Sequence, residues 1–196
     1  MPINTVFLDR DGVINYDRPD YVKSRNEFRF IPGSRKALAL LAGSGMKVIL
    51  ITNQSAVGRG IITSAGLESI HRHLLAGVKA AGGRIDDILY CPHRPEDDCS
   101  CRKPRPGLLL QAAARHCLRL DQAVMIGDSA KDIQAARAAG CNAAYLVKTG
   151  HWQEALAELG AAGQVPDKVF ANLLEAAGWI MATWRPEAAR FPARDC

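Results

Sequence analysis

Several features are absent or scarce in this chain of 196 residues. No apolar run approaches the ~20 residues that cross a bilayer, and the opening MPINTVFLDRDG has no signal-peptide pattern. Aromatic residues make up only 6% of the chain, and the Lys and Arg residues behind its net charge of +5 are scattered. The stacking residues and basic stripe of a nucleic-acid-binding surface are therefore missing. We expect a soluble, cytoplasmic monomer with no membrane or nucleic-acid partner, whose positive field suits a small anion.

The chain has six cysteines, but without an export signal the reducing cytosol argues against structural disulfides. Cys117 lies in an Ala- and Leu-rich helical run, and Cys141 follows a helix-ending glycine. We expect both to be inert, buried thiols. Three others, Cys91, Cys99 and Cys101, crowd together in one loop and need a different explanation.

Short apolar segments alternate with amphipathic ones along most of the chain. Strands are expected at residues 3–9, 46–53, 86–91, 123–128 and 142–147, and helices at 33–45, 63–82, 106–120 and 129–140. This alternation predicts an α/β fold with a Rossmann-like, doubly wound parallel sheet covered on both faces. We expect one domain over residues 1–182, with two further helices and a short strand after Gly150, and a flexible tail over 183–196. No inserted segment is large enough for a cap domain.

Polar residues follow four of the predicted strands. They are Asp9-Arg10-Asp11-Gly12, Thr52-Asn53-Gln54-Ser55, the cysteine loop with Arg102 and Lys103, and Gly127-Asp128-Ser129. Each group alone could be a turn or a helix cap. In an open parallel sheet, however, ligands bind outside the carboxyl ends of the strands. The four groups together therefore predict one functional site at this edge of the sheet.

Asp9 and Asp11 stand two residues apart on an extended backbone, so their side chains share a face. An Asx-type turn explains the pattern as simply. Two such carboxylates with Asp128 would also suit Mg²⁺, which prefers a few oxygen ligands and completes its shell with water. One carboxylate could then attack a phosphorus atom while the other acts as general acid and base.

A transferring phosphoryl group needs positive charge and hydrogen-bond donors around its oxygens. Thr52, the Asn53 backbone N–H and Lys103 could provide them. Asp132, one helical turn after Asp128, could orient Lys103 or a metal-bound water. It could equally be a favourable acid in the first turn of a helix.

The motifs FLDRDG, ITNQS, RKPRPG and IGDSAKD occur in this order between residues 6 and 150. As a set they resemble the four motifs of the haloacid dehalogenase-like (HAD) phosphohydrolases. The resemblance implies a phosphoric monoester hydrolase with Asp9 as nucleophile and Asp11 as general acid and base. It also implies Mg²⁺ held by the Asp9 carboxylate, the Asp11 backbone carbonyl and Asp128.

Within that superfamily, the segments YVKSRNEFRFIPG, TNQSAVGRG, CPHRPEDDCSCRKPRPG and YLVKTG are similar to those of the D-glycero-D-manno-heptose 1,7-bisphosphate phosphatases. This resemblance implies removal of the C7 phosphate through an aspartyl-phosphate intermediate, in the ADP-heptose route to lipopolysaccharide core. The substrate-binding residues that it implies are Asp17, Tyr21, Asn53, Gln54, Ser55, Arg59, Arg102 and Ser129. A solvated loop is an equally simple interpretation of residues 17–20.

The cysteine loop has the spacing C-x-H-x5-C-x-C, which offers four ligands suited to tetrahedral Zn²⁺. A C-x-C redox pair would leave the first cysteine and the histidine unexplained. The family resemblance supplies the zinc ligands Cys91, His93, Cys99 and Cys101. With no open position, this zinc would be structural and would hold Arg102 and Lys103 in place beside the substrate.

Three other functions stay open at this point. A histidinol-phosphate phosphatase shares the metal loop, and extra acidic residues beside the cleft would favour it, whereas Arg59 speaks against an amine substrate. A nucleic-acid end-processing phosphatase would need a continuous basic groove. A non-enzymatic zinc-loop module would not depend on Asp9. No role is assigned to the histidines that we place on helical surfaces or loops, His71, His73, His116 and His151.

Overall fold

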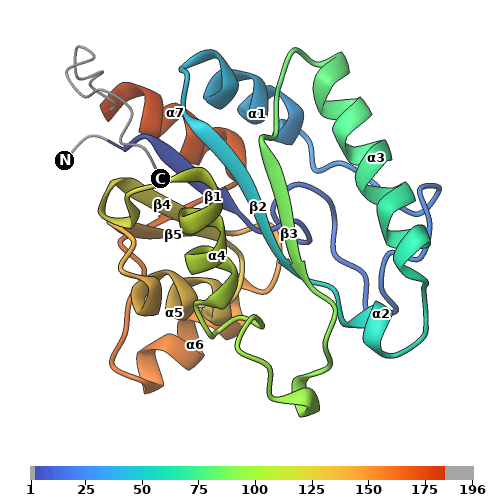
Figure 1. Ribbon diagram of the computed structural model, residues 1–196. Coiled ribbons are helices and arrows are strands. Elements are labelled where there is room, and N and C mark those ends of the chain that lie inside the picture. The colour runs from blue at the N-terminus through green and yellow to red at the C-terminus, as the bar shows by residue number, and fades with distance from the viewer. Residues whose placement is uncertain (1–2, 184–196) are drawn as a thin grey trace.

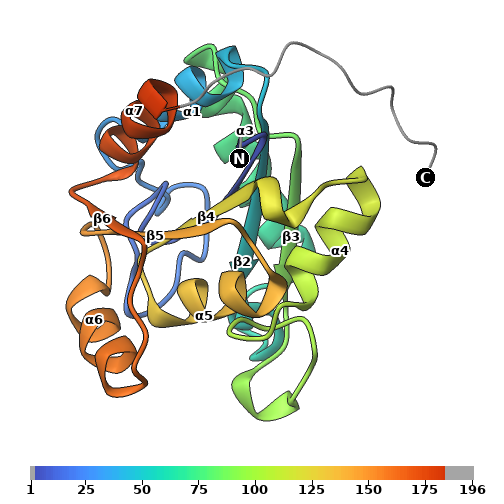
Figure 2. The ribbon, with the colours of Figure 1, turned by 90° about the vertical axis from the view of Figure 1, so that its left-hand side faces the viewer.

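The computed structural model describes residues 3–183. Six parallel strands form one sheet in the order β3-β2-β1-β4-β5-β6, as Figures 1 and 2 show. The strands are β1 (Thr5–Leu8), β2 (Lys47–Asn53), β3 (Asp87–Cys91), β4 (Ala123–Gly127), β5 (Ala143–Val147) and β6 (Lys168–Phe170). This strand order is that of a doubly wound Rossmann-like sheet, so the predicted fold class is confirmed.

Helices cover both faces of this sheet. They are α1 (Ser34–Gly43), α2 (Ser55–Gly58), α3 (Ser64–Ala80), α4 (Gly107–His116), α5 (Ala130–Ala139), α6 (Trp152–Ala161) and α7 (Leu173–Thr183). Short 3₁₀ turns span Pro95–Asp97 (η1) and Leu120–Gln122 (η2). Helices α1, α3 and α7 pack on one face, and α4, α5 and α6 pack on the other (Figures 1 and 2).

Side chains of the central strand β1 alternate between the two layers. Phe7 belongs to the core beneath α4, α5 and α6, whereas Val6 and Leu8 belong to the core beneath α1, α3 and α7. All three are fully buried. Because both faces are covered, the residues after Thr5 in β1 are all apolar rather than an alternation of apolar and polar residues.

The predicted strands and helices are confirmed, with ends that shift by a few residues. Thr63 caps α3 as expected, because its hydroxyl accepts a hydrogen bond from the Gly66 backbone N–H at 3.0 Å. Pro106 precedes α4 instead of starting it, and α2 was not predicted. The expectation of an inert free thiol is wrong for Cys117, which is disulfide-bonded, whereas Cys141 is a buried free thiol.

The predicted tail falls almost entirely outside the described residues. Thr183 ends α7, so this residue belongs to the last helix and not to the tail. The assignment of residues 1–182 to one domain stays a prediction, which the single continuous sheet supports. Within residues 3–183, no helix has both the length and the hydropathy that a bilayer crossing requires.

Strands β1 and β4 lie side by side although they are far apart in the sequence. The connections leave them in opposite directions, and in a doubly wound sheet this switch point opens a crevice for ligands. Asp9 and Asp128 directly follow the two strands. After β1 and Asp9, Gly12 turns the chain away from the sheet with a φ of 75°, and a Cβ on Gly12 would lie 2.3 Å from Asp128 Oδ2. Only glycine satisfies both constraints.

Candidate active site

Three carboxylates meet at this switch point. Asp9 and Asp128 follow β1 and β4, and Asp132 lies in the first turn of α5. One oxygen from each lies within 4.8 Å of the others. Asp128 and Asp132 are buried, and Asp9 Oδ1 is buried without a well-aligned hydrogen bond from any described residue. The central claim of the sequence analysis, that Asp9 and Asp128 converge, is thereby supported.

Lys103 places its ammonium inside this acidic cluster. Its Nζ lies 2.9 Å from Asp9 Oδ1 and 2.5 Å from Asp132 Oδ1, and it donates to the Ile51 carbonyl at 2.8 Å. The Lys103 side chain is only 3% exposed. Burial alone would lower the pKa of Lys103, but Asp132 and Asp9 outweigh it and hold that pKa above its usual value. Lys103 is therefore a fixed positive charge.

Neighbouring side chains hold this lysine and its partner in place. Asn53, at the end of β2, donates from Nδ2 to the Lys103 carbonyl and accepts at Oδ1 from the Lys103 N–H, both at 3.1 Å. Ser129 donates from Oγ to Asp132 Oδ2 at 2.8 Å and caps α5. Asp132 is thus both an acid of the first helical turn and the partner of Lys103, whereas its contact with a metal-bound water stays a prediction.

The electrostatics of the cluster favour a bound divalent cation. Burial raises the pKa of Asp9 to about 6, against the influence of Lys103 and with the help of Asp132 and Asp11. Burial also raises the pKa of Asp128 to about 8, with the help of Asp132 and Asp9. One lysine does not balance so many buried acids. Since carboxylate oxygens are hard ligands, the residues present fit Mg²⁺.

Asp11 does not belong to this cluster through its side chain. Its carboxylate accepts hydrogen bonds from Arg10 at 2.8 and 2.9 Å, from Asn15 at 2.8 Å and from the Gln54 amide at 2.8 Å. Burial would raise the pKa of Asp11, but Arg10, Asn15 and Gln54 together lower it. Asp11 is therefore an ionised carboxylate in this conformation.

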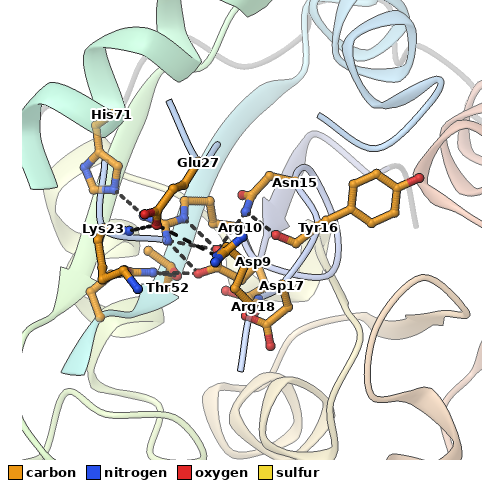
Figure 3. Close-up of polar contacts among 12 residues, drawn as sticks. Asp9, Arg10, Asn15, Tyr16, Asp17, Arg18, Lys23, Glu27, Thr52 and His71 are labelled. Atoms are coloured by element: carbon orange, nitrogen blue, oxygen red, sulfur yellow. Dashed lines mark hydrogen bonds and ion pairs between the residues drawn. The ribbon is translucent and has the colours of Figure 1, made fainter. Parts of the chain in front are cut away.

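Besides Asp11, Arg10 has a second partner that no motif indicated. Figure 3 shows His71 of α3 pointing at the fully buried Arg10, with 3.4 Å between His71 Nε2 and Arg10 Nη1. Burial, with a contribution from Arg10, lowers the pKa of His71 to about 4, so the ring is neutral. Our placement of His71 on a helical surface is wrong. Its spacing from Leu67 and Leu74 on the apolar face of α3 is the signal that indicated burial.

A cleft of about 540 Å³ opens beside the carboxylate cluster. Asp9, Asp11, Lys103 and Asp128 line it at the carboxyl ends of the strands. The predicted substrate-binding residues that also line it are Asp17, Tyr21, Asn53, Gln54, Ser55, Arg102 and Ser129. Most of the predicted site is therefore brought together.

Two predicted site residues do not line the cleft. Thr52 is 1% exposed, and its hydroxyl accepts a hydrogen bond from the Gln54 amide at 2.9 Å. Arg59 follows α2 and lies 3.6 Å from Glu96 in the cysteine loop. In this conformation Thr52 positions Gln54, and Arg59 joins two surface segments, so neither prediction of a substrate contact is supported.

One wall of the cleft comes from a region to which the sequence analysis gave no role. His151, Glu154 and Glu158, at and within α6, line the cleft together with Lys131 of α5. No motif marks these residues, because an amphipathic helix is all that the pattern of α6 predicts. Their presence follows from the position of α6 next to α5 at the same edge of the sheet.

The four predicted zinc ligands also converge. Cys91 ends β3, and the ligand atoms of the four residues lie within 4.8 Å of one another. The cysteine sulfurs are 3.3 to 3.5 Å apart, and His93 Nδ1 lies 3.3 Å from Cys101 Sγ and 3.6 Å from Cys91 Sγ. Sulfurs around tetrahedral zinc lie roughly 3.8 Å apart. The cluster fits a zinc ion, and the cysteines need only a slight expansion to accept it.

Comparison with known proteins agrees with this geometry. A family model described as HAD-hydrolase-like matches residues 100–176. The D-glycero-β-D-manno-heptose-1,7-bisphosphate 7-phosphatase of Bordetella bronchiseptica is 43% identical over 155 residues, which cover 79% of this chain and 86% of that protein. The chain belongs to the heptose-bisphosphate phosphatase family of HAD-like hydrolases. It is accordingly a phosphoric monoester hydrolase by family, as its motifs indicated.

Other members of the heptose-bisphosphate phosphatase family are similarly close. The 7-phosphatase of Neisseria meningitidis serogroup A is 40% identical over 176 residues, 90% of this chain and 94% of that protein. The crystal structure of the B. bronchiseptica D,D-heptose 1,7-bisphosphate phosphatase, complexed with magnesium and phosphate, has a TM-score of 0.86 at 39% identity. The aligned region covers 92% of this chain and 99% of that one. The Burkholderia thailandensis structure has a TM-score of 0.70 at 32% identity and covers 91% and 99%.

Proposed function

We propose that this chain is a Mg²⁺-dependent phosphatase that removes the C7 phosphate from D-glycero-D-manno-heptose 1,7-bisphosphate. The observation that carries the proposal is the buried group of Asp9, Lys103 and Asp128 at the switch point of the sheet. A nucleophilic carboxylate, a fixed cation and a hard metal ligand are the parts that phosphoryl transfer requires. Relatives at 40% identity or more, named for this activity, support the choice of substrate.

In this proposal the Asp9 and Asp128 carboxylates and the Asp11 backbone carbonyl hold the metal. When bound, Mg²⁺ supplies positive charge to the phosphoryl oxygens. Asp9 attacks the phosphorus and becomes an aspartyl phosphate, while the alcohol oxygen at C7 leaves. Lys103 neutralises charge on the phosphoryl oxygens, and Asp132 and Asn53 keep Lys103 at its position.

Asp11 is the proposed general acid for the leaving oxygen and then the base for the water that cleaves the aspartyl phosphate. Its present hydrogen bonds stabilise the ionised form. To deliver a proton, the Asp11 carboxylate must therefore leave Arg10 and the Gln54 amide, take up a proton from solvent and turn toward the leaving oxygen. Arg10 stays behind as a buried cation beside neutral His71.

The four-ligand cluster is proposed to bind structural zinc. The cysteine loop between β3 and α4 has little apolar cover of its own, and one bound ion would stiffen it. Arg102 and Lys103 directly follow the last ligand, so their positions depend on that stiffness. The cytoplasmic location, the monomeric state and the place in the ADP-heptose route stay predictions.

A histidinol-phosphate phosphatase is the second candidate, and one observation favours it. Glu154 and Glu158 line the cleft and could meet a substrate amine. Arg18, Arg102 and Lys131 line the same cleft, however, and balance those acids. The relatives reported above are named for the heptose substrate, so we retain the sugar bisphosphate as the proposed substrate.

The experiment compares phosphate release from the two substrates. We expect kcat/KM for heptose 1,7-bisphosphate to exceed that for histidinol phosphate by about 100-fold or more. Phosphorus NMR of the product should show that the phosphate at C1 remains and that at C7 is lost. Equal or reversed preference, or loss of the C1 phosphate, would contradict the proposal.

A further inference from the structure

The two walls of the cleft are joined at its mouth by a single polar side-chain contact. One wall is the cleft loop, residues 16–22, and the other is the segment 149–151 with α6. His151 Nε2 lies 2.9 Å from Asp17 Oδ2. Among the described residues, no other hydrogen bond or ion pair links the cleft loop to that opposite wall.

The cleft loop is anchored at its base and not at its tip. Val22 is buried and Tyr21 packs against the core beneath α1, α3 and α7. Residues 16–20 are exposed, and the ion pairs of Arg18 and Asp20 stay on the loop side of the cleft. Figure 3 shows the Tyr16 ring turned away from Asp17 and Arg18. Among the described residues, the contact of Asp17 is therefore what ties the tip to the opposite wall of the cleft.

The segment 149–151 is itself fixed to the reaction centre. The Thr149 hydroxyl donates to the Gly12 carbonyl, and the His151 backbone N–H donates to Asp128 Oδ2 at 2.9 Å. Gly150 approaches so closely that a Cβ there would lie 1.9 Å from Asp128 Oδ2. The His151 ring thus extends from a segment that is fixed against Asp128, a proposed metal ligand.

Both oxygens of Asp17 are engaged. Oδ1 accepts from the Arg18 backbone N–H at 2.8 Å, and Oδ2 accepts from the His151 ring. Each oxygen keeps a second lone pair that can accept a hydrogen bond from a sugar hydroxyl. A carboxylate held at both oxygens loses little further freedom when substrate arrives, and such preorganisation increases affinity.

We propose that His151 is a positioning residue that holds Asp17, and with it the tip of the cleft loop, where the polyol part of the substrate binds. The inference rests on the proposed sugar substrate. It assigns to the start of α6 a part in substrate selection. His151 acts through Asp17 and needs no contact with the reacting phosphate.

The test uses variants of the full chain with heptose 1,7-bisphosphate as the substrate. We expect His151→Ala to raise KM for heptose 1,7-bisphosphate about fivefold, with a smaller change in kcat, because an exposed polar pair contributes up to that factor. His151→Gln should restore KM to within about twofold, since an amide N–H can still donate to Asp17. The matched control is His116→Ala, which removes a similar 2.8 Å contact to Asp87 at the start of β3, away from the cleft.

Further measurements separate positioning from other causes. Asp17→Ala combined with His151→Ala should raise KM no more than Asp17→Ala alone, because both changes remove one interaction. The Mg²⁺ half-saturation should not move, since alanine keeps the backbone N–H that binds Asp128. Hydrogen exchange of residues 16–20 in the free protein should quicken in His151→Ala and not in His116→Ala.

The inference is overturned if His151→Ala leaves KM and the hydrogen exchange of residues 16–20 at their wild-type values, or if His151→Gln does not restore KM. It is also overturned if the effects of Asp17→Ala and His151→Ala on KM add, or if weaker Mg²⁺ binding accounts for the loss of activity. The proposed function fails in a different way. In that case the wild-type protein shows no preference for heptose 1,7-bisphosphate over p-nitrophenyl phosphate, whereas the exchange measurement still decides the role of His151.

Discussion

Charged residues build both the reaction centre and the outer walls of the cleft, but they are buried in the centre and exposed on the walls. In the centre, the Lys103 and Asp132 side chains are 3% and 0% exposed, and 2.5 Å separates Lys103 Nζ from Asp132 Oδ1. On the walls, the Arg18 and Asp20 side chains are 41% and 52% exposed. Buried pairs hold fixed geometry at high desolvation cost, whereas exposed pairs contribute about 0–1 kcal/mol each. We expect the centre to determine the rate of chemistry and the walls to adjust substrate affinity.

The largest loss of activity should follow a substitution of the proposed nucleophile, Asp9. Asp9→Asn removes the attacking oxygen charge and should lower kcat by about 1,000-fold or more. The fold and the zinc content should remain, because the amide fills the same space. Circular dichroism checks the fold, and elemental analysis checks the zinc content. Surviving activity would mean that another group attacks the phosphorus.

Removal of the buried cation should affect both rate and stability. Lys103→Met leaves Asp9 and Asp132 buried beside each other without their partner. We expect kcat to fall by about 100-fold and the free energy of unfolding to fall by about 3–5 kcal/mol. Urea denaturation measures the latter. Lys79→Met, on the exposed end of α3, is the control and should change neither.

Loss of the proposed zinc should have an intermediate effect. Cys99→Ser removes one ligand, so we expect less than one zinc per chain and a kcat/KM about 10-fold lower, since Arg102 and Lys103 lose their fixed base. Cys141→Ala, at a buried free thiol that follows α5, should keep its zinc. Full activity in zinc-free Cys99→Ser would separate the cysteine loop from catalysis.

The last prediction concerns the pH dependence of stability in the protein stripped of Mg²⁺. An aspartate in an unfolded chain titrates near 3.8, whereas burial raises the pKa of Asp128 to about 8. Between these values the folded state binds a proton that the unfolded state has lost. The contribution of Asp128 to the free energy of unfolding is therefore greatest below about pH 4 and falls as the pH rises toward about 8.

Denaturation at several pH values with and without Mg²⁺ checks this sign. Asp128→Asn should flatten the pH dependence, and Glu68→Gln on the surface of α3 should not. Stabilisation by Mg²⁺ should grow as the pH rises, because the cation binds the ionised carboxylates. A pH dependence between pH 4 and 8 that is the same in Asp128→Asn as in the wild-type protein would show that Asp128 carries fewer protons than its burial indicates.

The contrast between centre and walls also explains what could be predicted from sequence. Asp9, Asp128 and Lys103 follow strands or lie in a strand-end loop, and the topology of a parallel sheet fixes such positions. The directions of loop side chains have no such constraint. Arg59 therefore turned out to contact Glu96 outside the cleft, and Asp17 contacts His151, which no motif marked.

Thr52 and His71 also differ from what was predicted for them, in each case because of a neighbouring side chain. Thr52 lies near the carboxyl end of β2, but its hydroxyl is occupied by the Gln54 amide. His71 was assigned to a surface because a histidine is polar, although its helical spacing matches the buried face of α3. Hydrophobic periodicity predicted the elements well and also indicates burial of His71, but it does not identify the charged partner, Arg10.

The most direct test of the central claim is to trap phosphate on Asp9. Asp11→Asn cannot activate the water that cleaves an aspartyl phosphate, and p-nitrophenyl phosphate has a leaving group that needs no proton. After rapid acid quench, mass spectrometry should find about 80 Da added to the peptide that contains Asp9. The same mass on a different residue, or turnover that never leaves phosphate on the protein, would contradict the account.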